Sequence, residues 1–190
     1  LFWRSFTHWV GGMGVLIFLL ALIPNIEGSK IHLLKAESPG PTPGKIGPKS
    51  NQTAKILYVI YFVLTVIETI FLMIAGLTPF DAIIHALGTA GTGGFSNMNA
   101  SVGAFNNPAV EWIITIFMII FGINFVLYFQ LIRGNIKAVF KNEELKYYLI
   151  IIFTAIAIIT FNILKLNDGS YSKSLRDAAF QVTTIASTTG

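Results

Sequence analysis

The chain has 190 residues, of which 54% are hydrophobic and only 12% are charged, and its formal net charge is +4. A soluble domain usually carries about 25% charged residues, so this chain has too little polar surface to cover a core and needs lipid to do so. The sequence has no cysteine, which excludes disulfides and thiolate metal sites, and it has no run of mixed basic and aromatic residues that would suggest nucleic-acid binding.

Four segments are apolar and long enough, alone or with a flank, to cross a bilayer. The hydrocarbon core requires about 20 residues of α-helix. The four segments are residues 9–23 (with residues 1–8 as an extension), 56–76, 112–132 and 147–164. We therefore expect four transmembrane helices, and we expect Gly122, inside the third, to serve helix packing rather than a bend.

Lysine and arginine are concentrated in two of the connecting segments. Residues 25–55 carry five lysines and residues 133–146 carry three lysines and one arginine, whereas no basic residue other than histidine lies between Lys55 and Arg133. Because positive loops stay on the cytoplasmic side, we expect loops 25–55 and 133–146 to be cytoplasmic. The connection 77–111 then faces outside, and the chain is predicted to be a multi-pass protein of the plasma membrane.

The outer connection contains a helix of a different kind. Residues 79–90 are moderately apolar but number only 12, and the glycine and threonine run of residues 91–94 follows them. This length is too short to span a bilayer and suits a re-entrant helix. Irregular backbone at membrane depth is tolerated only where it lines a water-filled cavity. We therefore expect the turn after residue 90 to line such a cavity.

The same pattern recurs 96 residues later. Five of the 14 positions in 81–94 are identical to their counterparts in 177–190, where ordinary composition predicts about one. Both copies open with Ser/Thr-x-x-Asp, at residues 78–81 and 174–177, a capping box that predicts a helix N-terminus. Since each repeat unit has two spans, successive units enter the membrane in the same direction, unlike inverted repeats. The repeat predicts a ring around one pore.

The turn after each short helix has the composition of an ion-binding backbone. Potassium filters replace the hydration shell with backbone carbonyls and a threonine hydroxyl, and glycine reaches the required backbone angles at low steric cost. The C-terminus of the short helix also favours a cation. The predicted filter residues are Gly91, Thr92, Gly93, Gly94, Phe95, Thr188, Thr189 and Gly190, with potassium bound by the backbone carbonyls of Thr92, Gly93, Gly94, Thr188 and Thr189.

Five motifs carry a resemblance to a known family. They are residues 1–14 (LFWRSFTHWVGGMG), 36–41 (AESPGP), 80–82 (FDA), 93–96 (GGFS) and 187–190 (STTG). With them the chain resembles the TrkH-type pore subunit of the Trk/Ktr/HKT superfamily. The resemblance implies an all-α integral membrane protein whose tandem parallel repeats of helix, re-entrant pore helix and helix, as in potassium channels, surround one pore.

The resemblance also implies a division of the chain and a function. Residues 1–24 correspond to the last helix of repeat one, 25–52 to a cytoplasmic loop, 53–135 to repeat two and 145–190 to the first part of repeat three, so we expect a fragment of a longer protein. The implied function is potassium uptake, without a cofactor, with Gly94 as a filter glycine. The implied partners are a second copy, in a homodimer, and a cytosolic nucleotide-binding regulatory subunit.

Other interpretations stay open. A secondary active transporter of a small solute, coupled to sodium or protons, would need charged or aromatic contacts at the midplane, where only Glu68 qualifies; we favour a neutral or hydrogen-bonded carboxyl buried between helices. No enzyme is expected, because no catalytic pair or zinc-binding His-Glu-x-x-His occurs at suitable spacing. His85 is expected to form a hydrogen bond rather than to bind a metal. Asn124 and Gln130 either face the inner vestibule or bridge helices.

Overall fold

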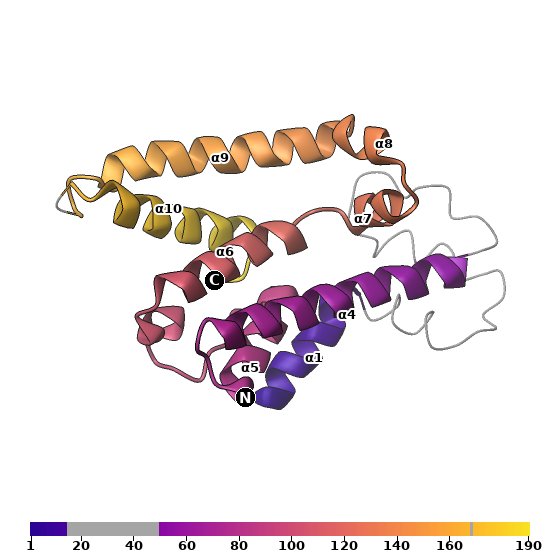
Figure 1. Cartoon of the computed structure of the whole chain (residues 1–190), viewed down its shortest axis with the longest axis horizontal. Coiled ribbons are helices and arrows are strands. Elements are labelled where there is room, and N and C mark those ends of the chain that lie inside the picture. Colours follow the sequence, from indigo (N-terminus) through magenta and orange to yellow (C-terminus); the bar gives the residue numbers. More distant parts are fainter. Residues whose placement is uncertain (15–49, 168) are drawn as a thin grey trace.

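The computed structural model describes residues 1–14, 50–167 and 169–190. Within these residues the regular structure is entirely helical, as expected, and Figure 1 shows its arrangement. In chain order the elements are α1 (Phe2–Gly12), α4 (Ser50–Ile74), α5 (Pro79–Ala90), the 3₁₀ helix η1 (Ser101–Phe105), α6 (Pro108–Phe121), α7 (Phe125–Ile132), α8 (Ile136–Phe140), α9 (Glu143–Ile163) and α10 (Tyr171–Ala186).

Two of the predicted spans are continuous helices. The segment Lys55–Ile74 of α4 and the whole of α9 are long and apolar enough to cross a membrane. Large apolar side chains on their outer faces stay exposed, as lipid contact requires, and examples are Ile70 and Phe71 on α4 and Ile151, Phe153 and Phe161 on α9. Lipid therefore takes the place of protein on these faces.

The predicted third span, residues 112–132, is broken rather than continuous. Helix α6 ends at Phe121, α7 begins at Phe125, and the two axes differ by 86°. The side chain of Asn124 accepts a hydrogen bond from the backbone N–H of Val126 at 3.0 Å and so starts a new helix. The expectation of one continuous span was therefore wrong, whereas Gly122 serves helix packing as expected, because a Cβ there would collide with the Tyr148 hydroxyl.

The break leaves backbone carbonyls of α6 without their usual helical donors, and tyrosines supply hydroxyls to two of them. The hydroxyl of Tyr128 donates to the Ile120 carbonyl at 2.7 Å, and that of Tyr148 on α9 donates to the Ile119 carbonyl at 3.2 Å. Asn124 also donates to the Glu144 carboxylate at 3.3 Å. Of the two roles left open for this asparagine, it therefore bridges helices.

The first predicted span is only partly described. Helix α1 ends at Gly12, and Gly14 has a φ of 88°, which a continuing helix does not have. The helix expected over residues 1–24 therefore ends before residue 14. Residues 15–23 lie outside the described residues, as does the predicted cytoplasmic loop up to residue 49. From Ser50 the chain is already helical. Inside the predicted loop 133–146, α8 forms and α9 begins.

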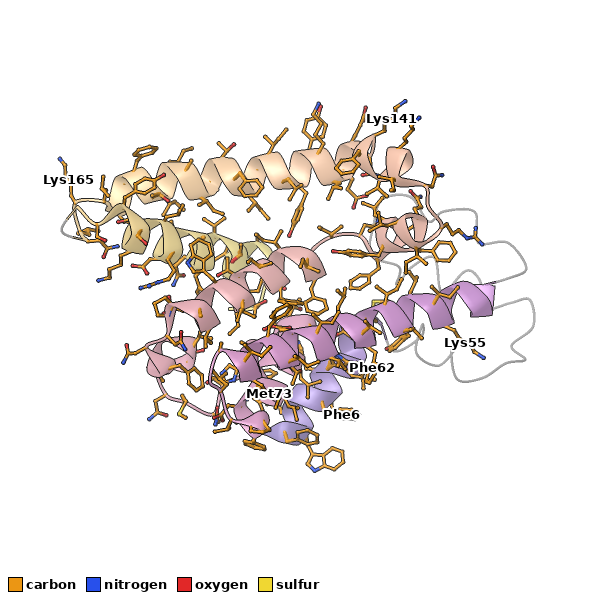
Figure 2. All side chains as sticks on the ribbon, viewed as in Figure 1. Phe6, Lys55, Phe62, Met73, Lys141 and Lys165 are labelled. Carbon is orange, nitrogen blue, oxygen red and sulfur yellow. The ribbon has the colours of Figure 1, made fainter. Side chains whose placement is uncertain are left out.

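The helices form two groups joined by α6. Helices α1, α4, α5 and α6 pack together on one side, while α10 packs against both α9 and α6 on the other. Helix α5 is almost wholly buried between its neighbours. Figure 2 shows Lys55 and Lys141 at one end of the molecule and Lys165 at the other. Lys55 and Lys141, one from each basic segment, thus share an end, and which side of the membrane that end faces stays a prediction.

Candidate functional site

The two short helices end in register. Helix α5 ends at Ala90 and α10 ends at Ala186, which is the 96-residue offset that the sequence predicts. Residues 91–95 form the first turn and residues 187–190 the second turn. Thr92 has a φ of 57° and Thr188 a φ of 59°, both in the left-handed region that non-glycine residues rarely adopt. The repeat is therefore present in the backbone as well as in the residue types.

Each turn folds back on its own helix through one carbonyl that accepts two backbone amides. In the first turn the Gly88 carbonyl accepts from the amides of Gly93 and Gly94, at 2.8 and 3.2 Å. In the second turn the Thr184 carbonyl accepts from the amides of Thr189 and Gly190, at 2.9 and 3.3 Å. This bonding directs the amides toward the helix. Among the described residues, no hydrogen bond reaches the backbone carbonyls of Thr92, Gly93, Gly94, Thr188 or Thr189. These carbonyls are free to bind a cation.

The two turns adjoin each other. A Cβ built on Gly94 would collide with the Thr189 carbonyl oxygen and lie 3.2 Å from the Gly190 carbonyl oxygen. Gly94 also has a φ of 57°, so a side chain there would be strained as well as obstructed. A cavity beside the contact is lined by residues of both turns and of their helices, including Gly88, Gly94, Thr184, Thr189 and Gly190. Figure 1 marks the C-terminal end of the chain close to α6, and Ile114 and Met118 of α6 line the same cavity.

Helix α1 packs against the first turn. A Cβ on Gly93 would lie 2.7 Å from the His8 ring, and a Cβ on Gly91 would lie 2.9 Å from the Trp9 amide. The Phe95 ring packs edge-on against the His8 ring, and the Arg4 guanidinium lies 3.9 Å from its centroid. Glycine is required here by close packing, and the Phe95 ring contacts α1.

The predicted capping box is correct for α5. The Thr78 hydroxyl accepts a hydrogen bond from the Asp81 amide at 3.2 Å and donates to the Asp81 carboxylate at 2.7 Å. Pro79 occupies the first helical position, where its missing N–H costs little.

For α10 the predicted capping box was wrong, because the helix begins one turn earlier, at Tyr171. The counterpart of Pro79 is Leu175, whose backbone N–H lets the helix continue toward the N-terminus. Ser174 and Asp177 instead receive hydrogen bonds from the Asn167 side chain, at 3.3 and 3.1 Å.

His85 ties the segment after the first turn to α5. Its Nδ1 lies 2.8 Å from the Asp81 carbonyl, which can only accept, so Nδ1 carries the proton and a neutral ring accepts at Nε2 from the Ser96 hydroxyl at 3.0 Å. Asn97 donates to the Asp81 carboxylate at 2.6 Å. His85 thus forms hydrogen bonds, as expected. The hydrogen bond that the Asp81 carboxylate accepts from Asn97, in addition to its place in the helix cap, was not predicted.

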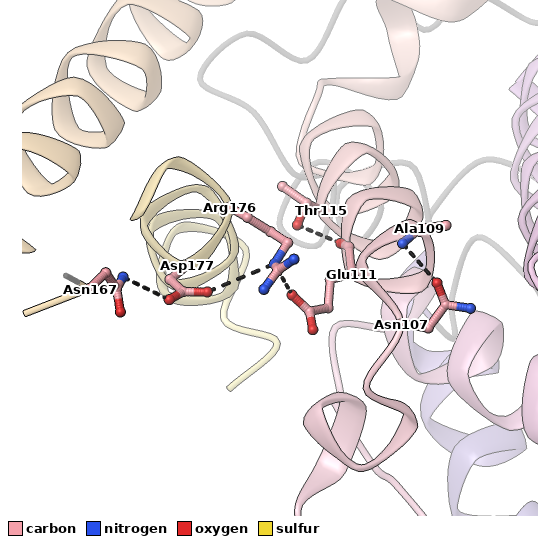
Figure 3. Close-up of polar contacts among 7 residues, drawn as sticks. All are labelled: Asn107, Ala109, Glu111, Thr115, Asn167, Arg176 and Asp177. Carbon is pink, nitrogen blue, oxygen red and sulfur yellow. Dashed lines mark hydrogen bonds and ion pairs between the residues drawn. The ribbon is translucent and has the colours of Figure 1, made fainter. Parts of the chain in front are cut away.

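An ion pair joins the two copies of the repeat. Arg176 of α10 lies 2.6 Å from the Glu111 carboxylate at the start of α6, and 3.9 Å from the Asp177 carboxylate (Figure 3). About a fifth of each of the Arg176 and Glu111 side chains is exposed (21% and 18%). No sequence pattern predicts this contact, because its two partners belong to different copies of the repeat.

Comparisons with known proteins agree on one family. The family model described as TrkH, cation transport protein, matches residues 1–190. The Trk system potassium uptake protein TrkH of Escherichia coli K12 is 37% identical over 193 residues, which cover 100% of this chain and 40% of that protein. The protein of that name from Vibrio parahaemolyticus is 33% identical over 195 residues, with the same coverage.

A solved structure resembles the fold as well. The crystal structure of the potassium transporter TrkH from Vibrio parahaemolyticus matches with a TM-score of 0.76 and 31% sequence identity, over 97% of this chain and 37% of that one. This chain thus spans about 40% of the length of the curated relatives named above. Because the family model matches every residue from 1 to 190, the chain belongs to the TrkH family of cation transport proteins.

Proposed function

We propose that this chain forms part of the pore of a potassium-uptake protein of the plasma membrane. The observation that carries the proposal is the pair of adjoining turns, which share a left-handed threonine and whose carbonyls at residues 92–94 and 188–189 accept no hydrogen bond from the part of the chain that the structure describes. In this proposal the carbonyls of both turns replace the water around a dehydrated potassium ion. The relatives named as Trk system potassium uptake proteins support potassium as the transported ion.

The helices behind the turns contribute to cation binding. Each turn follows the C-terminus of α5 or α10, where the helix dipole is equivalent to roughly half a negative charge. The turns contain no carboxylate, so a permeating ion meets only partial charges and can leave again. The amides held by the Gly88 and Thr184 carbonyls keep the turns in shape before an ion arrives.

The division of the chain is part of the proposal. Residues 1–24 are the last helix of repeat one, 53–135 repeat two and 145–190 the beginning of repeat three. The two adjoining turns then supply two neighbouring quarters of a filter whose other quarters come from further repeats of the whole protein. Support comes from the 96-residue offset, which relates α5 and α10 down to single hydrogen bonds.

Partners of the whole protein follow from the same family. We propose a homodimer, and a cytosolic nucleotide-binding subunit that contacts the basic segments 25–55 and 133–146. Support comes from the shared position of Lys55 and Lys141 at one end of the molecule and from relatives named as members of a Trk system.

Tracer flux into vesicles tests the function directly. The whole protein, purified and reconstituted into liposomes, should admit labelled rubidium, and external potassium should block that entry far better than external sodium. Rubidium entry that required an organic solute, or that sodium and potassium blocked equally, would refute a potassium-selective pore and favour a solute-coupled transporter.

A further inference from the structure

Three buried side-chain oxygens behind the first turn have no hydrogen-bond partner among the described residues. They are the hydroxyl oxygen of Ser5 and both carboxyl oxygens of Glu68, and both side chains are fully buried. An unpaired polar group inside a protein is costly, and an isolated carboxylate in a membrane is far more so. The structure must therefore satisfy these atoms in some other way.

Helices α1 and α4 run antiparallel where they touch. The Trp9 indole donates to the Thr65 hydroxyl at 3.0 Å, and the Tyr58 hydroxyl donates to the Val10 carbonyl at 3.0 Å. A later position on α1 thus faces an earlier position on α4.

This register relates the positions of the unpaired groups. Ser5 lies one helical turn before Trp9 on α1, and Glu68 lies about one turn after Thr65 on α4. Because the helices are antiparallel, both buried side chains lie on the same side of the Trp9–Thr65 contact.

Thr89 connects this interface to the first turn. Its hydroxyl lies beside the Glu68 carboxyl and donates its own proton to the His85 carbonyl at 2.9 Å, so it can still accept a hydrogen bond. The backbone carbonyl of Thr89 accepts from the Thr92 amide at 3.1 Å. A group that fixes Thr89 therefore also fixes the start of the turn.

We propose that Glu68 is a positioning residue for the first turn, acting through Thr89 as an uncharged carboxyl. Its carbonyl oxygen accepts from the Ser5 hydroxyl, and its own proton is donated to the Thr89 hydroxyl, which passes a hydrogen bond on to His85. All three orphaned oxygens are then satisfied without a buried charge. The chain of hydrogen bonds links α1, α4 and α5 and holds the turn at the height at which its carbonyls meet those of the second turn. The inference rests on the proposed potassium pore.

The test compares two replacements of Glu68 in the whole protein, reconstituted in liposomes at matched amounts. The readout is the ratio of rubidium to sodium uptake. Glu68→Leu cannot form the hydrogen bonds, and we expect the ratio to fall by about tenfold, the value of one lost buried hydrogen bond. Glu68→Gln is neutral and keeps both a donor and an acceptor, so it should retain the wild-type ratio.

Thr69→Val is the matched control on the same helix. The Thr69 hydroxyl donates to the Thr65 carbonyl within α4 at 2.8 Å, so its loss should leave the ratio unchanged. Thr89→Val removes the hydroxyl that is proposed to accept a hydrogen bond from Glu68, with little change in side-chain shape. It should lower the uptake ratio, and it tests the proposal even if Glu68→Leu fails to insert.

The outcomes separate the two claims. A Glu68→Gln protein as impaired as Glu68→Leu would show that the negative charge is needed and would overturn the proposal. A wild-type ratio in Glu68→Leu or in Thr89→Val would overturn it as well. If the unmodified protein takes up no rubidium, the proposed pore function itself is wrong.

Discussion

The carbonyl oxygen of Thr189 lies where a side chain at Gly94 would begin. The two residues come from different copies of the repeat. Gly94 is the fourth residue after the end of α5, and Thr189 is the third residue after the end of α10. Because both backbones need this space, the contact fixes the distance between the two turns. The spacing of the proposed ion ligands thus depends on residue 94 being glycine.

Replacing Gly94 with serine should lower the preference for potassium over sodium. A side chain at a φ of 57° adds about 1–2 kcal/mol of backbone strain, and it must also displace the Thr189 carbonyl. Since about 1.4 kcal/mol corresponds to a factor of ten, we expect the rubidium to sodium uptake ratio to fall about tenfold.

Gly103→Ser is the control for that change. Gly103 lies in η1 and has no atom within 4 Å of a built Cβ, so serine fits there. Uptake is to be measured in membranes with matched protein levels. Unchanged selectivity in Gly94→Ser would mean that residues 91–95 are not the filter.

Breaking the Arg176–Glu111 ion pair should destabilise the contact between the two copies. Each partner is mostly buried, so Arg176→Gln or Glu111→Gln leaves an incompletely compensated charge, and we expect each variant to lose about 1–2 kcal/mol of stability. Thermal unfolding in detergent would measure the loss.

A double-mutant cycle shows whether the two side chains act on each other. The Arg176→Gln, Glu111→Gln double variant should lose less stability than the two single variants added together. Strict additivity would show that the close approach of 2.6 Å contributes no coupling.

Gly122 and Tyr148 should behave as a pair. A Cβ on Gly122 would collide with the Tyr148 hydroxyl, so Gly122→Ala should cost about 1–3 kcal/mol through overpacking. Tyr148→Phe removes the obstructing oxygen, so the double variant Gly122→Ala, Tyr148→Phe should recover part of the stability that Gly122→Ala loses. No recovery in thermal unfolding would mean that alanine harms the break between α6 and α7 for another reason.

The orientation of the chain can be checked with introduced cysteines, since the sequence has none of its own. Lys55→Cys and Lys141→Cys place a thiol at one exposed end of the molecule, and Lys165→Cys places one at the other. In a whole protein otherwise free of cysteine, an impermeant reagent added to intact cells should label only residue 165. Labelling of residues 55 and 141 from outside would reverse the predicted topology.

Much of the local structure could be predicted from the sequence because it depends on near neighbours. Pro79 cannot donate a backbone hydrogen bond, so α5 begins there with Thr78 as its cap. The long apolar runs became α4 and α9 because only a helix satisfies the backbone in lipid. The 96-residue offset predicted the common end of α5 and α10.

Contacts between remote segments accompany the break in one helix and the early start of another. At the bend between α6 and α7, the local cap of Asn124 is joined by the Tyr148 hydroxyl from α9, which donates to the Ile119 carbonyl. The early start of α10 goes with the bonds from Asn167 to the side chains of Ser174 and Asp177. No apolar periodicity encodes which hydroxyl or amide lies across a gap.

The proposed site divides in the same way. The residue types of both turns, glycine and threonine after a short helix, follow from the angles that exposed carbonyls need, and the sequence by itself determined them. The contact of Gly94 with Thr189, and the burial of Glu68 beside Thr89, required the helices to be packed. Both are distances between residues remote in the chain, and only the packing of α1, α4, α5 and α10 sets them.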